Sequence, residues 1–339
     1  MQNRKIKISD EKLLEYIKAN SSCEKTFFLD LGVKKVRLVC YYETYIPFIE
    51  RQLTYSLREN LPEYDATVIL WHEDNVEHLH ENKQLFDNKT NIKHIIVSET
   101  MSTLMITDSG TYFYGAKNVN PDDFIKEGHI LVKIFNKILK TENTALIHGA
   151  CIGIDDKGVL ICARSQKGKS TLSVLSLLEG FDYVSDDYLT LEKENNNLFA
   201  YPIYSIITLS PVMYSKLYDR LQGTRFVSNS ARKDKYVINI ANLHNNFKTK
   251  YPIKLCMSLE FSKDENPSIT ECTAKEKGNA ITQMVHSTVK QMQDTQDCQT
   301  IKKLINMVSN FKFCKMYLCN NIYKNTELLK TFLQEYKDD

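Results

Sequence analysis

Apolar and polar residues alternate in short runs through the first third of the chain, a pattern typical of β-strands. The runs that predict strands are residues 26–31, 34–42, 66–71 and 92–97. Residues 104–114 predict a hairpin that turns at 108–110. Apolar residues at helical spacing predict helices at 11–19 and within 43–60. We therefore expect residues 1–117 to form an N-terminal α+β domain, whose role the pattern leaves open.

The pattern changes after residue 117. It predicts, in order, a helix at 122–140, strands at 144–154 and 158–163, a helix at 171–179 and a strand at 181–192. A turn at 155–158 joins the first two strands, Gly180 ends the second helix, and paired aspartates interrupt the last strand. Strand, loop, helix, strand is the order of a phosphate-binding α/β core. We therefore expect residues 118–339 to form a second, α/β domain.

The loop that enters the helix at 171–179 has the sequence RSQKGKS, which is nearly that of a phosphate-binding loop. Backbone N–H groups stay unpaired at such a helix N-terminus, and the helix dipole there favours an anion. Gly168 allows the backbone to curl, Lys169 suits the β- and γ-phosphates, and the Ser170 hydroxyl suits Mg²⁺. The predicted nucleotide-binding residues are Arg164, Ser165, Gln166, Lys167, Gly168, Lys169, Ser170 and Thr171.

Two features near this loop need separate interpretation. Ala163 stands where the first glycine of the motif is expected, and its methyl group is tolerable if the residue has a negative φ. Asp186 and Asp187 lie sixteen and seventeen residues after Ser170. At a strand end facing a phosphate loop, such a pair could provide both metal binding and a general base. The alternative is a solvated surface turn.

The motifs around the loop resemble those of the HPr kinase/phosphorylase family. His148-Gly149 lies before the loop and Asp186-Asp187 after it, at spacings that agree with the family pattern. The chain is more similar to the shorter relatives in this family, which include the kinases that tailor lasso peptides. The segment 311–336 also resembles the final strand and helix of those kinases. The resemblance implies an α/β (α+β) fold with a P-loop kinase core like that of phosphoenolpyruvate carboxykinase, over roughly residues 119–339.

The same resemblance implies ATP and Mg²⁺ as cofactors and assigns roles within the site. Lys169 and the loop hold ATP, while Ser170 and Asp186 bind the metal. Asp187 accepts the proton of the attacking hydroxyl, and His148 lies near the transferred phosphoryl group. The predicted activity is an ATP-dependent kinase that phosphorylates a Ser-type hydroxyl on a peptide, protein or small metabolite. Phosphoryl transfer needs little beyond positioning, charge neutralisation and a base, which agrees with these assignments.

A further basic stretch occupies residues 230–240, where a polar loop enters a predicted strand. Arg232, Lys233 and Lys235 are candidates to stabilise transferred charge, and Lys235 is the preferred one. A solvated charge run is the alternative. Three other polar residues, His72, His78 and His80, lie close together in the sequence. They predict a solvated polar helix rather than a metal site, because the pattern supplies no further fixed ligand.

The sequence also departs from the family. The second metal-binding glutamate of a Glu-x-Arg-Gly stretch is missing, and counting in register reaches Val212. Phosphorylase activity and HPr as the acceptor are therefore not expected. Two other functions stay open: a carboxykinase-like enzyme that uses ATP, and a nucleotide-binding regulator without catalysis. Dependence on oxaloacetate would identify the first, and absence of ADP release would identify the second.

Composition narrows the class of partners and the compartment. The formal net charge is +2, so nucleic acid and anionic membrane gain no support from an excess of basic residues. The N-terminus lacks the apolar segment of a signal peptide, and no apolar run is long enough for a transmembrane helix. Nine cysteines are scattered singly, which predicts reduced thiols and a cytoplasmic location. Homo-oligomerisation is left open.

Overall fold

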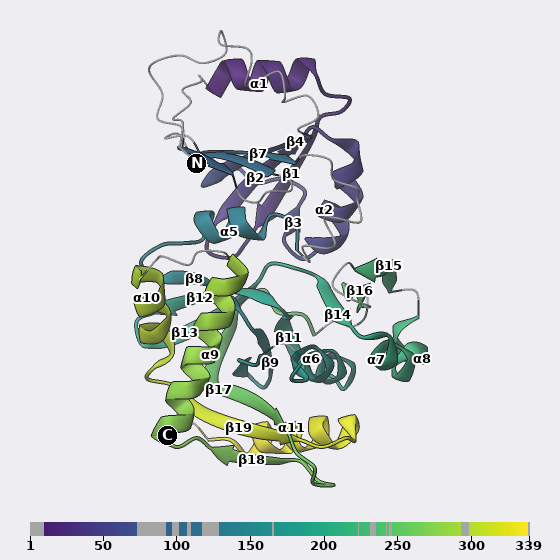
Figure 1. Cartoon of the computed structure of the whole chain (residues 1–339), viewed down its shortest axis with the longest axis vertical. Coiled ribbons are helices and arrows are strands. Elements are labelled where there is room, and N and C mark those ends of the chain that lie inside the picture. The colour runs from purple at the N-terminus through teal and green to yellow at the C-terminus, as the bar shows by residue number, and fades with distance from the viewer. Residues whose placement is uncertain are drawn as a thin grey trace. The chain divides into compact units, whose positions relative to one another are not determined.

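A computed structural model describes most of the chain, which divides into two compact units, Met1–Ile130 and Leu131–Asp339 (Figure 1). The described residues are 10–72, 93–96, 102–106, 110–116, 129–164, 166–222, 224–230, 235–241, 243, 246–292 and 298–337. The boundary predicted between residues 117 and 118 lies outside these ranges. Both units combine strands with helices, so the mixed α/β class expected from the sequence is confirmed.

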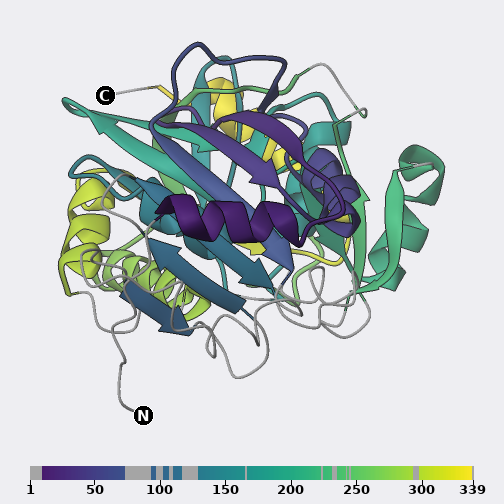
Figure 2. The same cartoon turned by 90° about the horizontal axis from the view of Figure 1, so that it is seen from above.

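The described residues of the N-terminal unit form a seven-stranded sheet of order β3-β1-β2-β4-β7-β6-β5. Its strands are β1 (Lys25–Asp30), β2 (Lys35–Cys40), β3 (Leu57–Arg58), β4 (Ala66–His72), β5 (Lys93–Ile96), β6 (Ser102–Ile106) and β7 (Thr111–Ala116). Helix α1 (Asp10–Ala19) lies across one face of the sheet (Figure 2). Leu13 and Ile17 of α1 are buried there against Ile69 and Trp71 of β4. The predicted first helix, strands and hairpin are confirmed, although residues 107–109 of the turn lie outside the description.

The helix predicted within residues 43–60 is shorter than expected. The segment forms a 3₁₀ turn, η1 (Glu43–Tyr45), and helix α2 (Ile46–Gln52), and the remainder leaves the helix. The reason is strand pairing: Leu57 and Arg58 form β3 and pair with β1, which helical spacing alone does not reveal. Similarly, α5 (Val132–Ile138) begins only after Leu131, whose φ of 62° lies in the left-handed region. The sequence predicted this helix over residues 122–140, and residues 122–128 of that range lie outside the described residues.

The described residues of the C-terminal unit contain a nine-stranded sheet. Its strands are β8 (Thr144–His148), β9 (Ala150–Ile154), β10 (Lys157–Ile161), β11 (Asp182–Ser185), β12 (Tyr188–Glu194), β13 (Asn197–Pro202), β17 (Tyr251–Phe261), β18 (Ser268–Glu271) and β19 (Lys312–Leu318). Strand β17 is central, because it pairs in parallel with both β10 and β19. The turn predicted between β9 and β10 is confirmed, and its residues Asp155 and Asp156 both have the positive φ of a type I′ hairpin.

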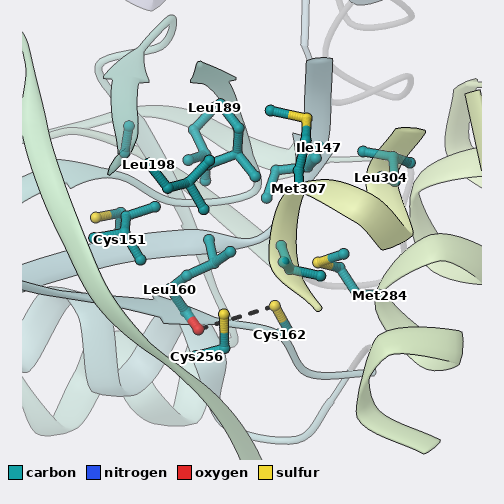
Figure 3. Close-up of a cluster of buried hydrophobic side chains, with 14 of the residues drawn as sticks. Ile147, Cys151, Leu160, Cys162, Leu189, Leu198, Cys256, Met284, Leu304 and Met307 are labelled. Atoms are coloured by element: carbon teal, nitrogen blue, oxygen red, sulfur yellow. Dashed lines mark hydrogen bonds between the residues drawn. The ribbon is translucent and has the colours of Figure 1, made fainter. Parts of the chain in front are cut away.

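Helices cover both faces of this sheet. They are α6 (Lys169–Leu178), α9 (Ala274–Met292), α10 (Cys298–Val308) and α11 (Ile322–Glu335). On one face, Met284 of α9 and Leu304 of α10 pack over Cys151 and Leu160 (Figure 3). Side chains alternate along a strand, so Ile152 points to the opposite face, where α6 and α11 pack together against β9. The sheet is therefore buried on both sides, which holds the loop ends at its edge in fixed positions.

The sequence segment 144–154, predicted as one strand, is two strands that separate at Gly149. Strand β8 pairs with β12, whereas β9 pairs with β10 and β11. The segment 182–194 separates in the same way at Asp186 and Asp187, because β11 pairs with β9 and β12 with β8. The backbone N–H of Gly149 donates to the Asp187 carbonyl at 3.0 Å. Two chain segments thus change neighbours at one point, and this point carries the predicted site residues.

A three-stranded sheet completes the described part of the C-terminal unit. It consists of β14 (Ile206–Leu209), β15 (Arg225–Ser230) and β16 (Lys235–Asn239), with helices α7 (Pro211–Lys216) and α8 (Tyr218–Leu221) beside it. Across the described residues of the whole chain, eight cysteines are free thiols. In that same part of the chain, every helix is too short or too polar to cross a bilayer.

Candidate active site

The loop between β10 and α6 has the conformation that its small residues predict. Gly168 precedes α6 with a φ of 89°, in the left-handed region that favours glycine. A Cβ atom at Gly168 would lie 2.7 Å from Cδ1 of Leu318, so the position also lacks room for a side chain. Ala163 is buried and does not occur among the described residues with positive φ. The condition under which its methyl group is tolerable is therefore met.

Asp186 and Asp187 lie in the short connection between β11 and β12. Asp187 has a φ of 66°, which is uncommon for a residue with a side chain and is found preferentially at functional sites. The Asp187 carbonyl accepts a hydrogen bond from the Gly149 N–H. This bond holds the β11–β12 connection against the residue that joins β8 to β9. Asp186 is completely buried. The solvated surface turn considered for this pair is thus wrong for Asp186.

Lys169, the first residue of α6, binds both carboxylates. Its Nζ lies 2.6 Å from Oδ1 of Asp186 and 2.7 Å from Oδ1 of Asp187. The lysine is 6% exposed and the Asp187 side chain 17% exposed, so water screens this cluster only weakly. The predicted loop lysine and the predicted aspartate pair therefore form one buried ionic group.

The charges of this group are unequal, because one ammonium faces two carboxylates. Burial lowers the pKa of Lys169, but the charges of Asp186 and Asp187 outweigh it and raise that pKa well above its usual value. Burial raises the pKa of the Asp186 carboxyl, while Lys169 opposes the rise and the charge of Asp187 adds to it. The Ser170 hydroxyl also opposes the rise. Two carboxylates thus share one ammonium, which leaves carboxylate oxygens in the cluster that suit a further cation.

His148 ends β8 beside the same aspartate. Its Nε2 lies 3.5 Å from Oδ1 of Asp187, and its side chain is only 6% exposed. The backbone N–H of His148 donates to the Thr288 hydroxyl of α9 at 3.0 Å. The ring packs edge-on to Tyr188, with 5.6 Å between centroids. The structure therefore brings together the histidine, the lysine and both aspartates singled out in the sequence.

Three neighbours of this cluster were missed by the sequence reasoning. The Thr208 hydroxyl of β14 donates to Oδ2 of Asp187 at 3.5 Å. Thr288, which lies 140 residues further along the chain, accepts a hydrogen bond from the His148 backbone N–H. Tyr188 packs against the His148 ring. Tyr188 directly follows the aspartate pair and could have been noticed there. Thr208 and Thr288 carry no local signal, because only the folded chain places them at the site.

The remaining predicted residues surround the cluster or lie away from it. Ser170 and Thr171 are half-buried in the first turn of α6, and Arg164 and Gln166 are exposed. Lys167 and Gly168 are half-buried, and Ser165 lies outside the described residues. Lys235 begins β16 and is half-buried, and it makes no hydrogen bond or ion pair with the described residues of the cluster. Its role stays a prediction. Arg232, Lys233, His78 and His80 lie outside the described residues.

The cluster also offers ligands of the kind that Mg²⁺ prefers. Oδ2 of Asp186 is buried without a hydrogen-bond partner in the described part of the chain. Such an orphaned oxygen is costly unless a cation or water binds it. Together with the Ser170 hydroxyl, it gives a set of hard oxygen donors that suits Mg²⁺. Within the described ranges, no group of three His, Cys, Asp or Glu residues could hold a metal ion, so other ligands would come from substrate and water.

Comparisons with known proteins give a similarity of fold. No family model and no curated protein matches the chain. Among solved structures, the chain is similar to the HPr(Ser) kinase/phosphatase from Coxiella burnetii, with 16% sequence identity and a TM-score of 0.32. The match covers 56% of this chain and 93% of that chain. Similarity at this level concerns the fold alone and defines no equivalent residues.

Proposed function

We propose that this protein is an ATP-dependent kinase that transfers the γ-phosphoryl group to a hydroxyl of a peptide, protein or small metabolite. The observation that carries the proposal is the buried cluster in which Lys169 contacts Asp186 and Asp187 at the start of α6. A cation shared by two carboxylates beside a strand–loop–helix connection provides the parts that phosphoryl transfer requires. Those parts are a phosphate cradle, a mobile positive charge and a base.

The loop is suited to hold the triphosphate. Backbone N–H groups in the first turn of α6 have no acceptor within the helix and point out of its N-terminus, where an anion binds favourably. Arg164 and Lys167 add positive charge near this end. When the triphosphate binds, Lys169 gains further anionic partners at the β- and γ-phosphates. Against the effect of burial, the two aspartates raise the pKa of Lys169, so its ammonium stays charged. That ammonium is then shared between the phosphates and the aspartates.

Asp187 is the proposed general base. Transfer of Lys169 toward the phosphates weakens its contact with Oδ1 of Asp187 and leaves that oxygen available for a hydroxyl proton. The partial exposure of Asp187 gives an acceptor access, which the fully buried Asp186 lacks. His148, 3.5 Å from the same oxygen, is positioned to interact with the transferred phosphoryl group or to hold Asp187 in place. Thr208 restrains the other carboxylate oxygen.

Asp186 and Ser170 would hold Mg²⁺ together with phosphate oxygens. The buried oxygen of Asp186 that has no hydrogen-bond partner among the described residues supports this assignment. When bound, the ion neutralises charge on the triphosphate and on the transition state. The second metal-binding glutamate of the bifunctional family members has no counterpart here, so we propose a kinase without phosphorylase activity.

The proposal predicts that Lys169→Ala loses phosphoryl transfer. Removing the ammonium takes away charge stabilisation of the β- and γ-phosphates, which should lower the rate by about 10²-fold or more. ADP formation from ATP and Mg²⁺ is measured with water or a pool of Ser-containing peptides as the acceptor. Lys290→Ala, which removes an exposed lysine of α9, is the matched control and should retain the wild-type rate. Unchanged turnover of Lys169→Ala would exclude the loop from the mechanism.

A further inference from the structure

The N-terminal unit contains a cavity of about 360 Å³ whose lining is rich in aromatic side chains. This volume lies within the range of about 300–1,000 Å³ that is usual for small-molecule sites. Every residue of the lining belongs to the unit Met1–Ile130. The rings that line the cavity are those of Tyr16, Tyr41, Tyr42, Trp71 and His72.

The position of this cavity follows from the direction of the strands in the N-terminal sheet. Strands β2 and β4 are parallel neighbours, so their carboxyl ends share one edge of the sheet. Tyr41 and Tyr42 directly follow β2, and Trp71 and His72 end β4. In α/β sheets, ligands bind outside the carboxyl ends of the strands. The aromatic residues are therefore gathered at the edge where a ligand is expected.

Packing holds these rings in place. Tyr42 and His72 lie against each other with 4.4 Å between ring centroids and an interplanar angle of 31°. Tyr41 and Trp71 belong to the buried cluster under α1, and Tyr16 of α1 packs against that cluster. Rings that are already ordered lose little freedom when a ligand binds, so the cavity is preorganised.

The electrostatic surroundings of the cavity favour a positive charge. The faces of aromatic rings carry partial negative charge. Tyr16 lies in the last turn of α1, where the helix dipole is negative, and Lys18 of that turn is exposed and not part of the lining. Burial raises the pKa of the Tyr41 hydroxyl to about 12, the Glu24 carboxylate adds to this rise, and the Arg37 charge opposes it. Tyr41 therefore stays neutral, and a carboxylate lies near it.

The composition of the lining selects among cations. The described residues that line the cavity include no Asp, Glu, Lys or Arg. A primary ammonium is strongly hydrated, and this lining has no carboxylate to replace its water. A quaternary ammonium has no N–H group to satisfy and presents methyl groups around its charge. Such cations bind the faces of aromatic rings through cation–π interactions.

We propose that this cavity binds a small compound that carries a quaternary ammonium group, held among the rings of Tyr16, Tyr42 and Trp71. The site stands apart from the proposed phosphoryl transfer, because it uses no residue of the unit Leu131–Asp339. It gives the N-terminal unit a ligand of its own.

The test uses Trp71, which is the only tryptophan of the chain and therefore reports on this cavity through its fluorescence. The full chain is titrated with choline, with the alcohol in which a tert-butyl group replaces the trimethylammonium group, and with ethanolamine. Choline should change the emission until it saturates and should bind at least about fivefold more tightly than either comparison compound. Calorimetry with the same three compounds gives the affinities independently of the probe.

Ring substitutions test the cation–π contacts. Tyr42→Leu and Tyr16→Leu each remove a ring but keep apolar bulk, and each should weaken choline binding by about 3- to 30-fold. Tyr42→Phe keeps the ring and should bind choline like wild type. Tyr323→Leu removes a ring of α11 that is 48% exposed, and it should change nothing. Thermal melts establish that each variant is folded.

Several results would overturn this proposal. Equal affinity for choline and the uncharged alcohol would make the cavity a site for apolar groups, without recognition of charge. Equal affinity for choline and ethanolamine would show that the methyl groups and rings do not select the ligand. The absence of choline binding by both methods, or wild-type affinity in both folded leucine variants, would exclude the site. None of these results affects the proposed phosphoryl transfer, which depends on residues of the other unit.

Discussion

The single ammonium of Lys169 contacts two carboxylates, and this unequal number of basic and acidic groups is the main electrostatic feature of the site. A buried ion pair is worth little to stability unless its charges are balanced and fully hydrogen-bonded. Here Asp186 is completely buried and one of its oxygens has no partner in the described part of the chain. The arrangement is therefore costly to the free protein. Under the proposed function, a divalent cation bound with the triphosphate would relieve that cost.

Asp186→Asn should stabilise the protein in the absence of ligands. The pKa of Asp186 is raised above its ordinary value of 3.8, so the folded state holds this proton more tightly than the unfolded state. Its contribution to stability therefore falls as pH rises from about that value through the raised pKa. The substitution removes this loss, and the melting temperature at pH 7 should rise by a few degrees. Thermal melts of both proteins across the acidic range check this; a variant that melts lower at pH 7 contradicts it.

At the scale of elements, the site depends on two places where the chain leaves one strand pairing for another. Gly149 separates β8 from β9, and Asp187 with its left-handed φ separates β11 from β12. The hydrogen bond between them fixes His148 beside Asp187. The site also depends on the close approach of Gly168 to Leu318, which aligns α6 with the end of β19.

Gly168→Ala tests the last of these contacts. The new Cβ would lie 2.7 Å from Leu318, and φ at this position is +89°, so the loop must shift. The left-handed conformation alone should cost about 1–2 kcal/mol of unfolding free energy, and triphosphate affinity should fall. Gly278→Ala is the matched control, because nothing lies within 4 Å of its added Cβ in α9. That variant should gain about 0.5–1 kcal/mol. Denaturant titrations measure both; equal stabilities would contradict the described loop geometry.

Local signals explain which elements the sequence reveals. The turn at Asp155 and Asp156 and the end of α6 before Gly180 were predicted, because each depends on adjacent residues. The final strand and helix were expected from the family resemblance. The pairing change at Gly149 was not predicted, since the apolar pattern of 144–154 is the same for one strand or two. Likewise, Thr208 reaches Asp187 only through the pairing of distant strands. The sequence thus predicts the local turns and the types of residue at the site, but it does not predict which strands are neighbours.

At the scale of the whole molecule, the described residues of the proposed phosphate site all belong to the unit Leu131–Asp339. The loop, the aspartates and His148 lie on elements of this unit. The N-terminal unit has its own sheet and its own buried cluster around Trp71. We therefore expect the two units to divide the work, with nucleotide binding in one and acceptor recognition dependent on the other.

A fragment of residues 119–339 tests this division. It should fold and bind ATP with Mg²⁺ within about threefold of the full chain, a difference of less than 1 kcal/mol. It should fail to phosphorylate any acceptor that the full chain uses. Circular dichroism establishes folding and calorimetry measures affinity. A folded fragment that does not bind ATP would show that residues 1–118 contribute to the nucleotide site.

The most direct test of the proposed kinase is the substitution Asp187→Asn. The amide keeps the size of the side chain but cannot accept the hydroxyl proton. Single-turnover transfer from ATP and Mg²⁺ to water or a Ser-containing peptide is measured alongside ATP affinity, with Asp219→Asn on α8 as an exposed control. Affinity should change little, while transfer should fall by about 10²- to 10⁴-fold. Near wild-type transfer by Asp187→Asn would contradict the assignment of the base and, with it, the proposed phosphorylation of a hydroxyl.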